Sequence, residues 1–275
     1  MKNIKNLILL LLIPSYLTFG WGDKGHKLIA KHALDILDHE IKLSDEIKAA
    51  IIKHSVDPDY RKKEDKTEGP KHFIDIDYYK EFLDGHMITS KDSLAKIYGE
   101  EMVTKQGILP WATEDTFAKL VEAMKNKNKE AFILYASDLA HYVGDGHQPL
   151  HACLNYNGQL TSQKGIHFRY EIEMLDKYLP EIESSLFNRS PMKISDLTGF
   201  IFDYISESNM YVDLLLAADT QALKFAQQKY DDAYYKLLWF RTKYVTDTEI
   251  NEGSFALASL IYTAWLEAGK PNLEF

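Results

Sequence analysis

The segment 141–151, HYVGDGHQPLH, is the part of this sequence that most restricts how the chain can fold. It follows an apolar run, 131–140, whose spacing favours an α-helix. His141 and Asp145 are four residues apart, so a helix projects both side chains from one face. The Gln-Pro pair that follows should end this helix, which lets His151 turn back towards the same face. Two histidines and a carboxylate gathered in this way are ligands that zinc accepts.

The same residues also have an ordinary explanation, because Asp145 could cap a helix and the histidines could lie on the surface. One His/Asp pair at this spacing is common and does not establish a metal site by itself. Further residues of ligand type stand beside turn or helix-end signals elsewhere in the chain. The full set is five histidines and three carboxylates: His26, Asp59, His72, His141, Asp145, His151, His167 and Glu171. Together they indicate a multinuclear metal site inside a helical bundle.

The composition is that of a globular protein with a large core and an acidic surface. The chain has 275 residues, of which 45% are hydrophobic, and no repeat or linker divides it. We therefore expect a single domain over residues 21–275. Acidic residues outnumber basic ones, 41 to 32, which argues against a broad basic surface for nucleic acid. A phosphate-bearing substrate remains compatible, because bound metal ions supply local positive charge.

The first twenty residues have the pattern of a signal peptide. Lys2 and Lys5 precede a short apolar run, 7–13, and Gly20 places a small residue at the expected cleavage point. The apolar run is too short for a stable transmembrane helix. An uncleaved N-terminal anchor is the alternative. We expect a secreted or periplasmic protein whose mature chain begins at Trp21.

The remaining pattern is mostly helical, so the expected fold is an all-α bundle. Ser44 is a predicted N-cap. Segments 56–70 and 155–165 are expected to be loops, and 72–77 an extended loop or the entry to a helix. The expected helices, beside the one after Ser44 and the one carrying His141, cover residues 26–39, 93–98, 110–126, 168–175, 197–216, 221–240 and 253–268.

The ordered motifs resemble a superfamily of zinc-dependent phosphodiesterases. It contains the single-strand-specific nucleases of fungi and plants (the S-one/P-one nuclease family) and the bacterial zinc phospholipases C. The resemblance covers nearly the whole chain from Trp21 onward. It depends on five motifs: Trp21-Gly-x-x-Gly-His26, Pro-Asp59, His72-Phe-Ile-Asp75, His141-x-x-Gly-Asp145-x-x-Gln-Pro-Leu-His151 and His167-x-x-x-Glu171. It implies an all-helical fold that holds three zinc ions.

The resemblance also implies how the ligands are divided among the ions. One ion of a close pair would take Asp59, His72, His141 and Asp145. Its partner would take the backbone amine and carbonyl of Trp21, His26, and Asp145 as a bridge. The third would take His151, His167 and Glu171. Asp57 is a competitor for the place of Asp59, and manganese or iron could also occupy such mixed sites.

Three further residues have expected roles in catalysis or in substrate binding. Two zinc ions about 3.5–4 Å apart can activate a water for in-line attack on phosphorus, assisted by Asp59 and Asp145. Arg61 is expected to offset charge on the phosphoryl oxygens. Phe73 could stack on a base, and Asp75 could accept a hydrogen bond from it. The alternative is that Phe73 belongs to the core and Asp75 orients a neighbour.

The sequence therefore predicts a zinc-dependent hydrolase of phosphoric esters. The short spacing from Trp21 to His26 is the nuclease arrangement, so the predicted substrate is single-stranded nucleic acid or a nucleotide. Glu171 stands where the nucleases usually carry Asp and the phospholipases carry Glu. Zinc phospholipase C, acting on a phospholipid head group, is therefore the alternative. A zinc-binding protein without turnover is the alternative of another class. No protein partner is implied, and a monomer is expected.

Overall fold

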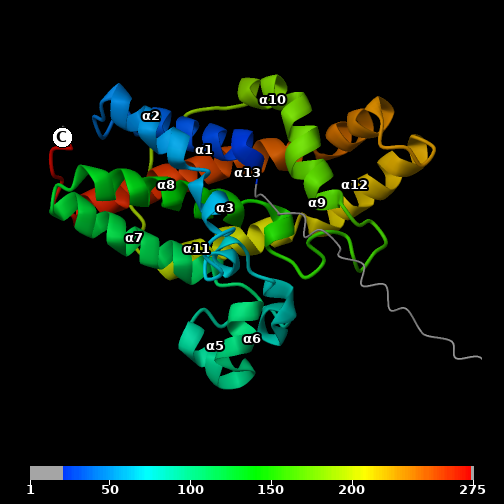
Figure 1. Ribbon diagram of the computed structural model, residues 1–275, viewed down its shortest axis with the longest axis horizontal. Helices are drawn as coiled ribbons and strands as arrows, with labels where there is room; N and C mark the ends of the chain where they lie inside the picture. The colour runs from blue at the N-terminus through cyan, green and yellow to red at the C-terminus, as the bar shows by residue number, and fades with distance from the viewer. Residues whose placement is uncertain (1–20, 274–275) are drawn as a thin grey trace, which may run out of the picture.

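The computed structural model describes residues 21–273, and within this range the regular secondary structure is helical throughout (Figure 1). The all-α prediction is therefore confirmed. The predicted signal peptide, residues 1–20, lies outside the described residues. The elements are α1 (Gly22–Leu37), α2 (Asp45–His54), α3 (Asp57–Arg61), η1 (Gly69–His72), η2 (Ile76–Tyr78), α4 (Lys80–Leu83), α5 (Lys91–Tyr98), α6 (Glu100–Lys105), α7 (Leu109–Lys125), α8 (Lys129–Gly146), η3 (Pro149–His151), α9 (Ile166–Phe168), the π-helical η4 (Arg169–Met174), α10 (Leu175–Ser184), α11 (Leu197–Asn209), α12 (Val212–Phe225) and α13 (Asp232–Glu267).

Side-chain caps explain where several of these helices begin. The Ser44 hydroxyl accepts a hydrogen bond from the backbone N–H of Ile47 at 3.3 Å, which confirms the predicted start of α2. The Asn128 side chain accepts from the N–H of Ala131 at 3.0 Å and starts α8 in the same way. These local signals fix where α2 begins and where α8, the helix that carries His141 and Asp145, begins.

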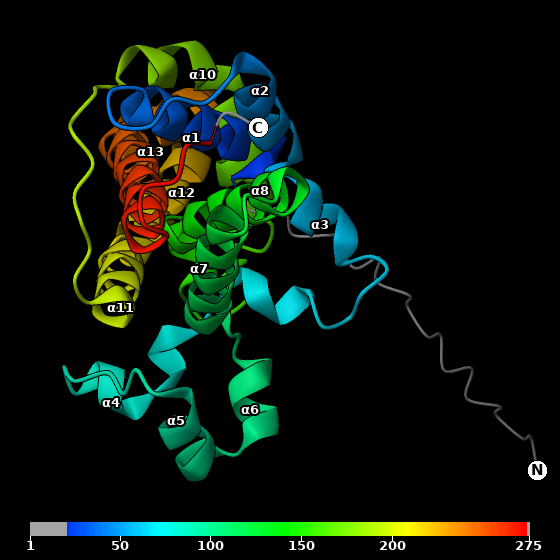
Figure 2. The same ribbon diagram turned by 90° about the vertical axis from the view of Figure 1, so that its left-hand side faces the viewer.

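The centre of the molecule is built from α1, α8 and α13. Helix α1 packs along α13, and α8 contacts both of them as well as α2 and α7 (Figures 1 and 2). Helices α4, α5 and α6 extend away from this bundle (Figure 2). Every residue from 139 to 153 is buried, so the polar side chains of the central motif lie inside the core. Buried polar groups need partners, and this placement is the first structural sign of a site.

The predicted helix boundaries near the C-terminus were wrong. The expected helix 197–216 spans the break between α11 and α12, and the expected helix 221–240 spans the break between α12 and α13. The second break contains Gln227 and Gln228, whose φ angles are 53° and 67°. Residues other than glycine seldom adopt such angles, so the sequence carries no signal for this turn. The expected helix 253–268 is the last part of the 36-residue α13.

The prediction of a loop over residues 56–70 was also wrong in part, because α3 lies within it. Pro58 occupies the first turn of α3, where a helix does not need the missing N–H of proline. Proline there marks the start of a helix and not a break. The short helix matters for function, since it turns Asp59 inward, where it is 1% exposed.

None of the helices among residues 21–273 combines the length and apolar character needed to cross a membrane.

Candidate metal centre

Helix α8 contributes His141 and Asp145, both fully buried. Nδ1 of His141 lies 2.8 Å from the carbonyl oxygen of Ser55. A carbonyl only accepts hydrogen bonds, so the neutral ring carries its proton on Nδ1 and its lone pair on Nε2. That Nε2 atom lies 3.3 Å from Oδ2 of Asp145. The four-residue spacing therefore brings an imidazole lone pair and a carboxylate to one point, as the sequence predicted.

Helix α1 adds His26 to the same point. Nε2 of His26 is 3.4 Å from Oδ1 of Asp145, and its ring stacks on that of His141 with centroids 4.0 Å apart. This approach requires glycine at position 144, because a Cβ there would lie 2.8 Å from Nδ1 of His26. The glycine of the central motif thus makes room for the histidine of the N-terminal motif.

Asp59 from α3 and His72 from η1 close the cluster on the other side. Nδ1 of His72 lies 3.0 Å from Oδ2 of Asp145 and 3.5 Å from Oδ1 of Asp59. It also lies 3.0 Å from Nε2 of His141. The two oxygens of Asp145 therefore face different neighbours, Oδ1 towards His26 and Oδ2 towards His72 and His141.

A third group forms next to the first two from His151, His167 and Glu171. Nε2 of His167 is 2.6 Å from Oε2 of Glu171 and 3.0 Å from Nε2 of His151. Nδ1 of His151 is 2.6 Å from the carbonyl oxygen of His72, which leaves Nε2 of His151 as the lone-pair nitrogen in the neutral ring. The side-chain amide of Gln148 donates to Oε2 of Glu171 at 3.0 Å. The sequence did not reveal this supporting role of Gln148.

The geometry of these three groups fits a metal with N and O ligands. In each of the triads His26/His141/Asp145, Asp59/His72/His141 and His151/His167/Glu171, the candidate ligand atoms lie within 4.8 Å of one another. A tetrahedral zinc with bonds of about 2.0–2.1 Å holds its ligand atoms about 3.3 Å apart. The distances from Asp145 to His26, His72 and His141 run from 3.0 to 3.4 Å and agree with this value.

Unsatisfied polar atoms support the same conclusion. Both ring nitrogens of His26 and both carboxylate oxygens of Asp145 are buried and make no hydrogen bond, and Oδ2 of Asp59 is in the same state. Such atoms cost free energy in a folded protein unless something binds them. A cation held between them removes this cost, so the residues present fit a metal.

Burial shifts the pKa values of His72, His167 and Glu171. It lowers the pKa of His72 and the pKa of His167 to about 4, so both rings are neutral at pH 7, as metal binding requires. Burial raises the pKa of Glu171 to about 8, against the opposing influence of His151 and Gln148. A metal bound there would displace the proton of Glu171.

The pKa of Asp145, in the cluster with His26, His72 and His141, is shifted in the opposite direction to that of Glu171. Burial disfavours the charged form of Asp145, but His141 and His151 outweigh it and hold the pKa of Asp145 well below its usual range. Burial also opposes protonation of His141, yet Asp145 and Asp59 raise the pKa of this ring to about 8. The protein therefore places concentrated negative charge where a cation can replace the proton of His141.

Asp59 and its competitor Asp57 lie in different environments. The carboxylate of Asp57 is 46% exposed and lies 2.7 Å from Nδ1 of His54. Asp59 is buried beside His72 and His141. The arrangement favours Asp59 as the ligand.

We expect Asp59→Asn to lower the phosphodiesterase rate far more than Asp57→Asn does. Loss of a group that only supports a metal ligand lowers metal affinity or activity by about 10–100-fold. Loss of a ligand itself should therefore lower the rate by at least about 100-fold. Asp57→Asn is the matched control, two residues away on the same helix, and should stay within about threefold of wild type because an exposed ion pair contributes little. The measurement is the rate at which each variant hydrolyses a chromogenic phosphodiester. A lower rate for Asp57→Asn than for Asp59→Asn would identify Asp57 as the ligand.

Arg61 and Lys62 stand next to each other but face different groups. The guanidinium of Arg61 donates to both oxygens of Asp138, at 2.9 and 2.8 Å, and to Glu68 at 3.2 Å. Nζ of Lys62 lies 2.5 Å from Oδ1 of Asp59, and its side chain is 10% exposed. Lys62 therefore lies beside a candidate metal ligand. Its three-residue spacing from Asp59 was the only signal for it in the sequence.

The segment that carries Phe73 and Asp75 runs directly beside the metal centre. Phe73 is extended, with φ −154° and ψ 168°, and half-buried. The N–H of Ile74 donates to the carbonyl of His151 at 2.9 Å, which ties the segment to the third group. Asp75 is 8% exposed, and burial, reinforced by Asp77, raises the pKa of its carboxyl to about 7. Its carboxyl can therefore act as donor or acceptor near neutral pH.

Trp21 lies at the start of α1 and is completely buried. Its indole packs against Tyr170 with ring centroids 5.8 Å apart, and its carbonyl accepts from the N–H of Gly25 at 3.2 Å. Gly22, with φ +60°, provides the turn that places the Trp21 backbone before the helix. A Cβ on Gly22 would lie 3.6 Å from the carbonyl oxygen of Glu171, so this end of the described chain passes close to the third group.

His147 lies outside the three groups of candidate ligands. Its Nδ1 lies 2.8 Å from the carbonyl of Val143, and its ring stacks on Tyr204 with centroids 4.4 Å apart. The sequence motif contains this histidine, but the structure turns it towards α11.

One curated protein shares a short stretch with this chain. A 57-residue segment is 39% identical to part of a probable serine protease from Bradyrhizobium tropiciagri. The segment is 21% of this chain, and the match spans only 7% of the length of that protein. A match of this extent carries no statement about fold or activity.

A family comparison covers much more of the chain. The model of the family described as S1/P1 Nuclease matches residues 21–165, which are 145 of the 275 residues and so just over half. The match includes every candidate ligand of the paired groups and His151, whereas His167 and Glu171 follow it. The family is zinc-dependent and hydrolyses phosphodiester bonds. The match and the buried ligand groups agree, and the chain belongs to the S1/P1 nuclease family.

Proposed function

We propose that this protein is an exported tri-zinc phosphodiesterase that cleaves single-stranded nucleic acid. One observation carries the proposal: three ligand groups lie together, with the two oxygens of Asp145 facing different histidines. When bound, zinc lowers the pKa of a coordinated water and polarises phosphoryl oxygens. The proposed ligands are those predicted from the sequence: Trp21, His26, Asp59, His72, His141, Asp145, His151, His167 and Glu171.

The surrounding residues keep the ligands in the geometry that this chemistry needs. The carbonyls of Ser55 and His72 hold the rings of His141 and His151 in the tautomers that present Nε2. Gln148 orients Glu171. Such supporting hydrogen bonds fix ring orientation and raise the basicity of the ligands. The site therefore requires little rearrangement when substrate binds.

We propose that Lys62 supplies positive charge beside the metal centre. It is held beside Asp59, and an ammonium there can offset the charge of a phosphoryl oxygen. We assign this role to Lys62 in place of Arg61, because Lys62 contacts the proposed ligand Asp59, whereas Arg61 contacts Asp138 and Glu68. Arg61 then has a structural role, because it holds the carboxylates of Asp138 and Glu68 in place.

Phe73 and Asp75 form the proposed base pocket. Phe73 is half-buried, so part of this residue is open to contact with a ligand. Asp75 carries a carboxyl whose pKa is about 7 and can exchange hydrogen bonds with a base edge. Glu171 and the acidic surface favour phospholipase C, whereas Phe73 favours a nucleotide, because a base offers a ring for it to stack on.

We expect Phe73→Ala to raise the Michaelis constant for nucleotide substrates and to leave the zinc content unchanged. Loss of one stacking platform costs roughly 1–3 kcal/mol, or about 5- to 150-fold in affinity. Phe73→Tyr is the control and should keep most of the affinity, because it retains the ring face. An unchanged Michaelis constant in a destabilised Phe73→Ala protein would assign Phe73 to the core.

The experiment that tests the function compares substrates in parallel. Zinc-loaded protein beginning at Trp21 is incubated with single-stranded DNA, duplex DNA, RNA and phosphatidylcholine vesicles, and the products are quantified. We expect cleavage of the single strands at rates well above those for duplex and lipid. Hydrolysis of lipid alone would favour the phospholipase alternative. No turnover of any phosphodiester, in protein that holds its zinc, would favour the non-catalytic alternative.

A further inference from the structure

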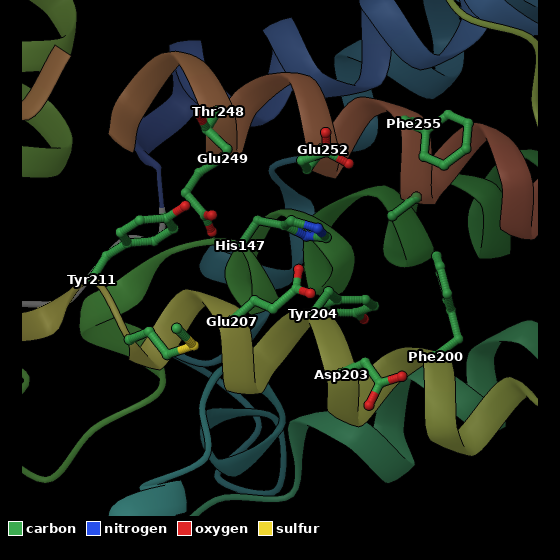
Figure 3. A pocket seen from close by; sticks show the side chains of 12 residues that line it. His147, Phe200, Asp203, Tyr204, Glu207, Tyr211, Thr248, Glu249, Glu252 and Phe255 are labelled. Atoms are coloured by element: carbon green, nitrogen blue, oxygen red, sulfur yellow. The ribbon is translucent and has the colours of Figure 1, made fainter. Parts of the chain in front are cut away.

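A second candidate site is the cavity between α11 and α13 (Figure 3). Its volume is about 590 Å³, and His147 at the end of α8 contributes to its wall. None of the proposed zinc ligands lines it. Four carboxylates line it, those of Asp203, Glu207, Glu249 and Glu252, and no Lys or Arg among residues 21–273 does. Carboxyl groups therefore dominate the charged part of its wall.

Glu249 is the residue that points to a ligand. It is 3% exposed, and its Oε2 atom is buried without a hydrogen-bond partner. Figure 3 shows its carboxylate in the space between Tyr211 and His147. Burial raises the pKa of Glu249 well above its usual range, and Glu207 and Glu252 add to this effect against the influence of Ser208. A buried acceptor in this state gains from a ligand that donates hydrogen bonds.

The edge of the cavity already shows how its residues hold a cation. The guanidinium of Arg189 pairs with Glu252 and lies over the ring of Phe255, with its central carbon 3.4 Å from the ring centroid. A carboxylate beside an aromatic face is a favourable environment for a guanidinium. The inner end offers the same combination, since Glu207 and Glu249 lie beside the rings of Tyr204 and Tyr211 (Figure 3).

A divalent metal ion fits this cavity less well than an organic cation. Within residues 21–273, the sets of three ligand atoms close enough to share an ion are all at the metal centre. The carboxylates of the cavity are instead spread along its wall. An extended molecule can contact several of them, and the side chains of Phe200 and Met210 offer apolar surface for its carbon chain.

We propose that this cavity binds a small organic cation of the guanidinium class. Glu249 and Glu207 take the charged end, and the aromatic residues contact the planar cation and its carbon chain. The site is separate from the proposed nuclease chemistry, so the two proposals can fail independently.

The test measures binding of butylguanidinium to the zinc-loaded protein by calorimetry and by the shift in Tm. Butylurea is the matched neutral ligand, because it has nearly the same shape without the charge. We expect saturable binding of butylguanidinium and none of butylurea. Glu249→Gln keeps the size of the side chain and should weaken binding by at least about tenfold, equivalent to 1.4 kcal/mol. Glu267→Gln, an exposed position on the same helix, is the control and should bind as wild type.

A second variant protects the test against a folding defect in Glu249→Gln. Glu207 is exposed, so Glu207→Gln should fold normally and weaken binding by about two- to fivefold. Zinc content and phosphodiesterase rate should stay unchanged in both variants. Equal binding of butylurea, undiminished binding by Glu249→Gln and Glu207→Gln, or displacement of the ligand by millimolar Ca²⁺ would each overturn the proposal.

Discussion

Asp145→Asn is expected to remove zinc from the paired groups and to lower the phosphodiesterase rate by at least about 100-fold, more than the loss of a supporting group costs. Asp145 is fully buried, and its two oxygens face His26 on one side and His72 with His141 on the other. An asparagine has nearly the same shape but one neutral acceptor oxygen, so it cannot bridge two dications. Zinc per chain and rate on a chromogenic phosphodiester are the measurements.

The same substitution should also destabilise the protein. Zinc binding contributes to folding free energy, and a chain of this size loses roughly 2–4 °C in Tm for each kcal/mol. We therefore expect a lower Tm in zinc-containing buffer and a smaller difference after chelation. Asp92→Asn on α5, an exposed position, is the control. Full zinc content and full rate in Asp145→Asn would show that the central motif has another role.

The second large effect is expected at the N-terminus. We propose that cleavage after Gly20 creates a ligand, because it converts the peptide nitrogen of Trp21 into an amine. An α-amino group has a pKa of about 7.7–8.0, so a metal can displace its proton near neutral pH. The buried indole of Trp21, packed on Tyr170, holds this end of the chain in place. Without such anchoring, ordering the terminus would cost conformational entropy on binding.

Two forms of the protein test this step. One begins at Trp21, and the other carries Met-Gly before it. We expect the extended form to lose zinc from the group around His26 and to retain no more than about 1% of the rate, as for loss of a ligand. A third form with Trp21→Phe and a free terminus separates the roles of amine and indole, and should keep its zinc. Equal zinc content and rate in the first two forms would leave Trp21 as an apolar anchor only.

Much of the fold could be predicted because its signals are local. The Ser44 cap and the apolar spacing of α1 depend on neighbours a few residues away, and both were found. The turn at Gln227 and Gln228 was missed, since these residues adopt positive φ without the glycine that normally marks it. At Pro58 the sequence predicted a loop, but the proline lies in the first turn of α3. Boundaries fail where tertiary packing overrides local preference.

The proposed ligands could be selected because each stands in a recognisable motif. The structure brings His26, Asp59 and His72 to Asp145, although they lie far from it in the sequence. The supporting residues were harder to find. Gln148 acts through a contact with Glu171 across the fold, and Asp138, which engages Arg61, is on a different helix 77 residues away. Such partners become visible only when the helices are packed together.

The most direct test of the central claim is to locate zinc in crystals of the protein that begins at Trp21. Anomalous scattering measured on both sides of the zinc absorption edge identifies the element and its positions. We predict three zinc peaks, two of them beside Asp145 and one between His151, His167 and Glu171, at the three groups that the structure brings together. No zinc peak at these groups, or zinc bound only elsewhere on the molecule, would contradict the account.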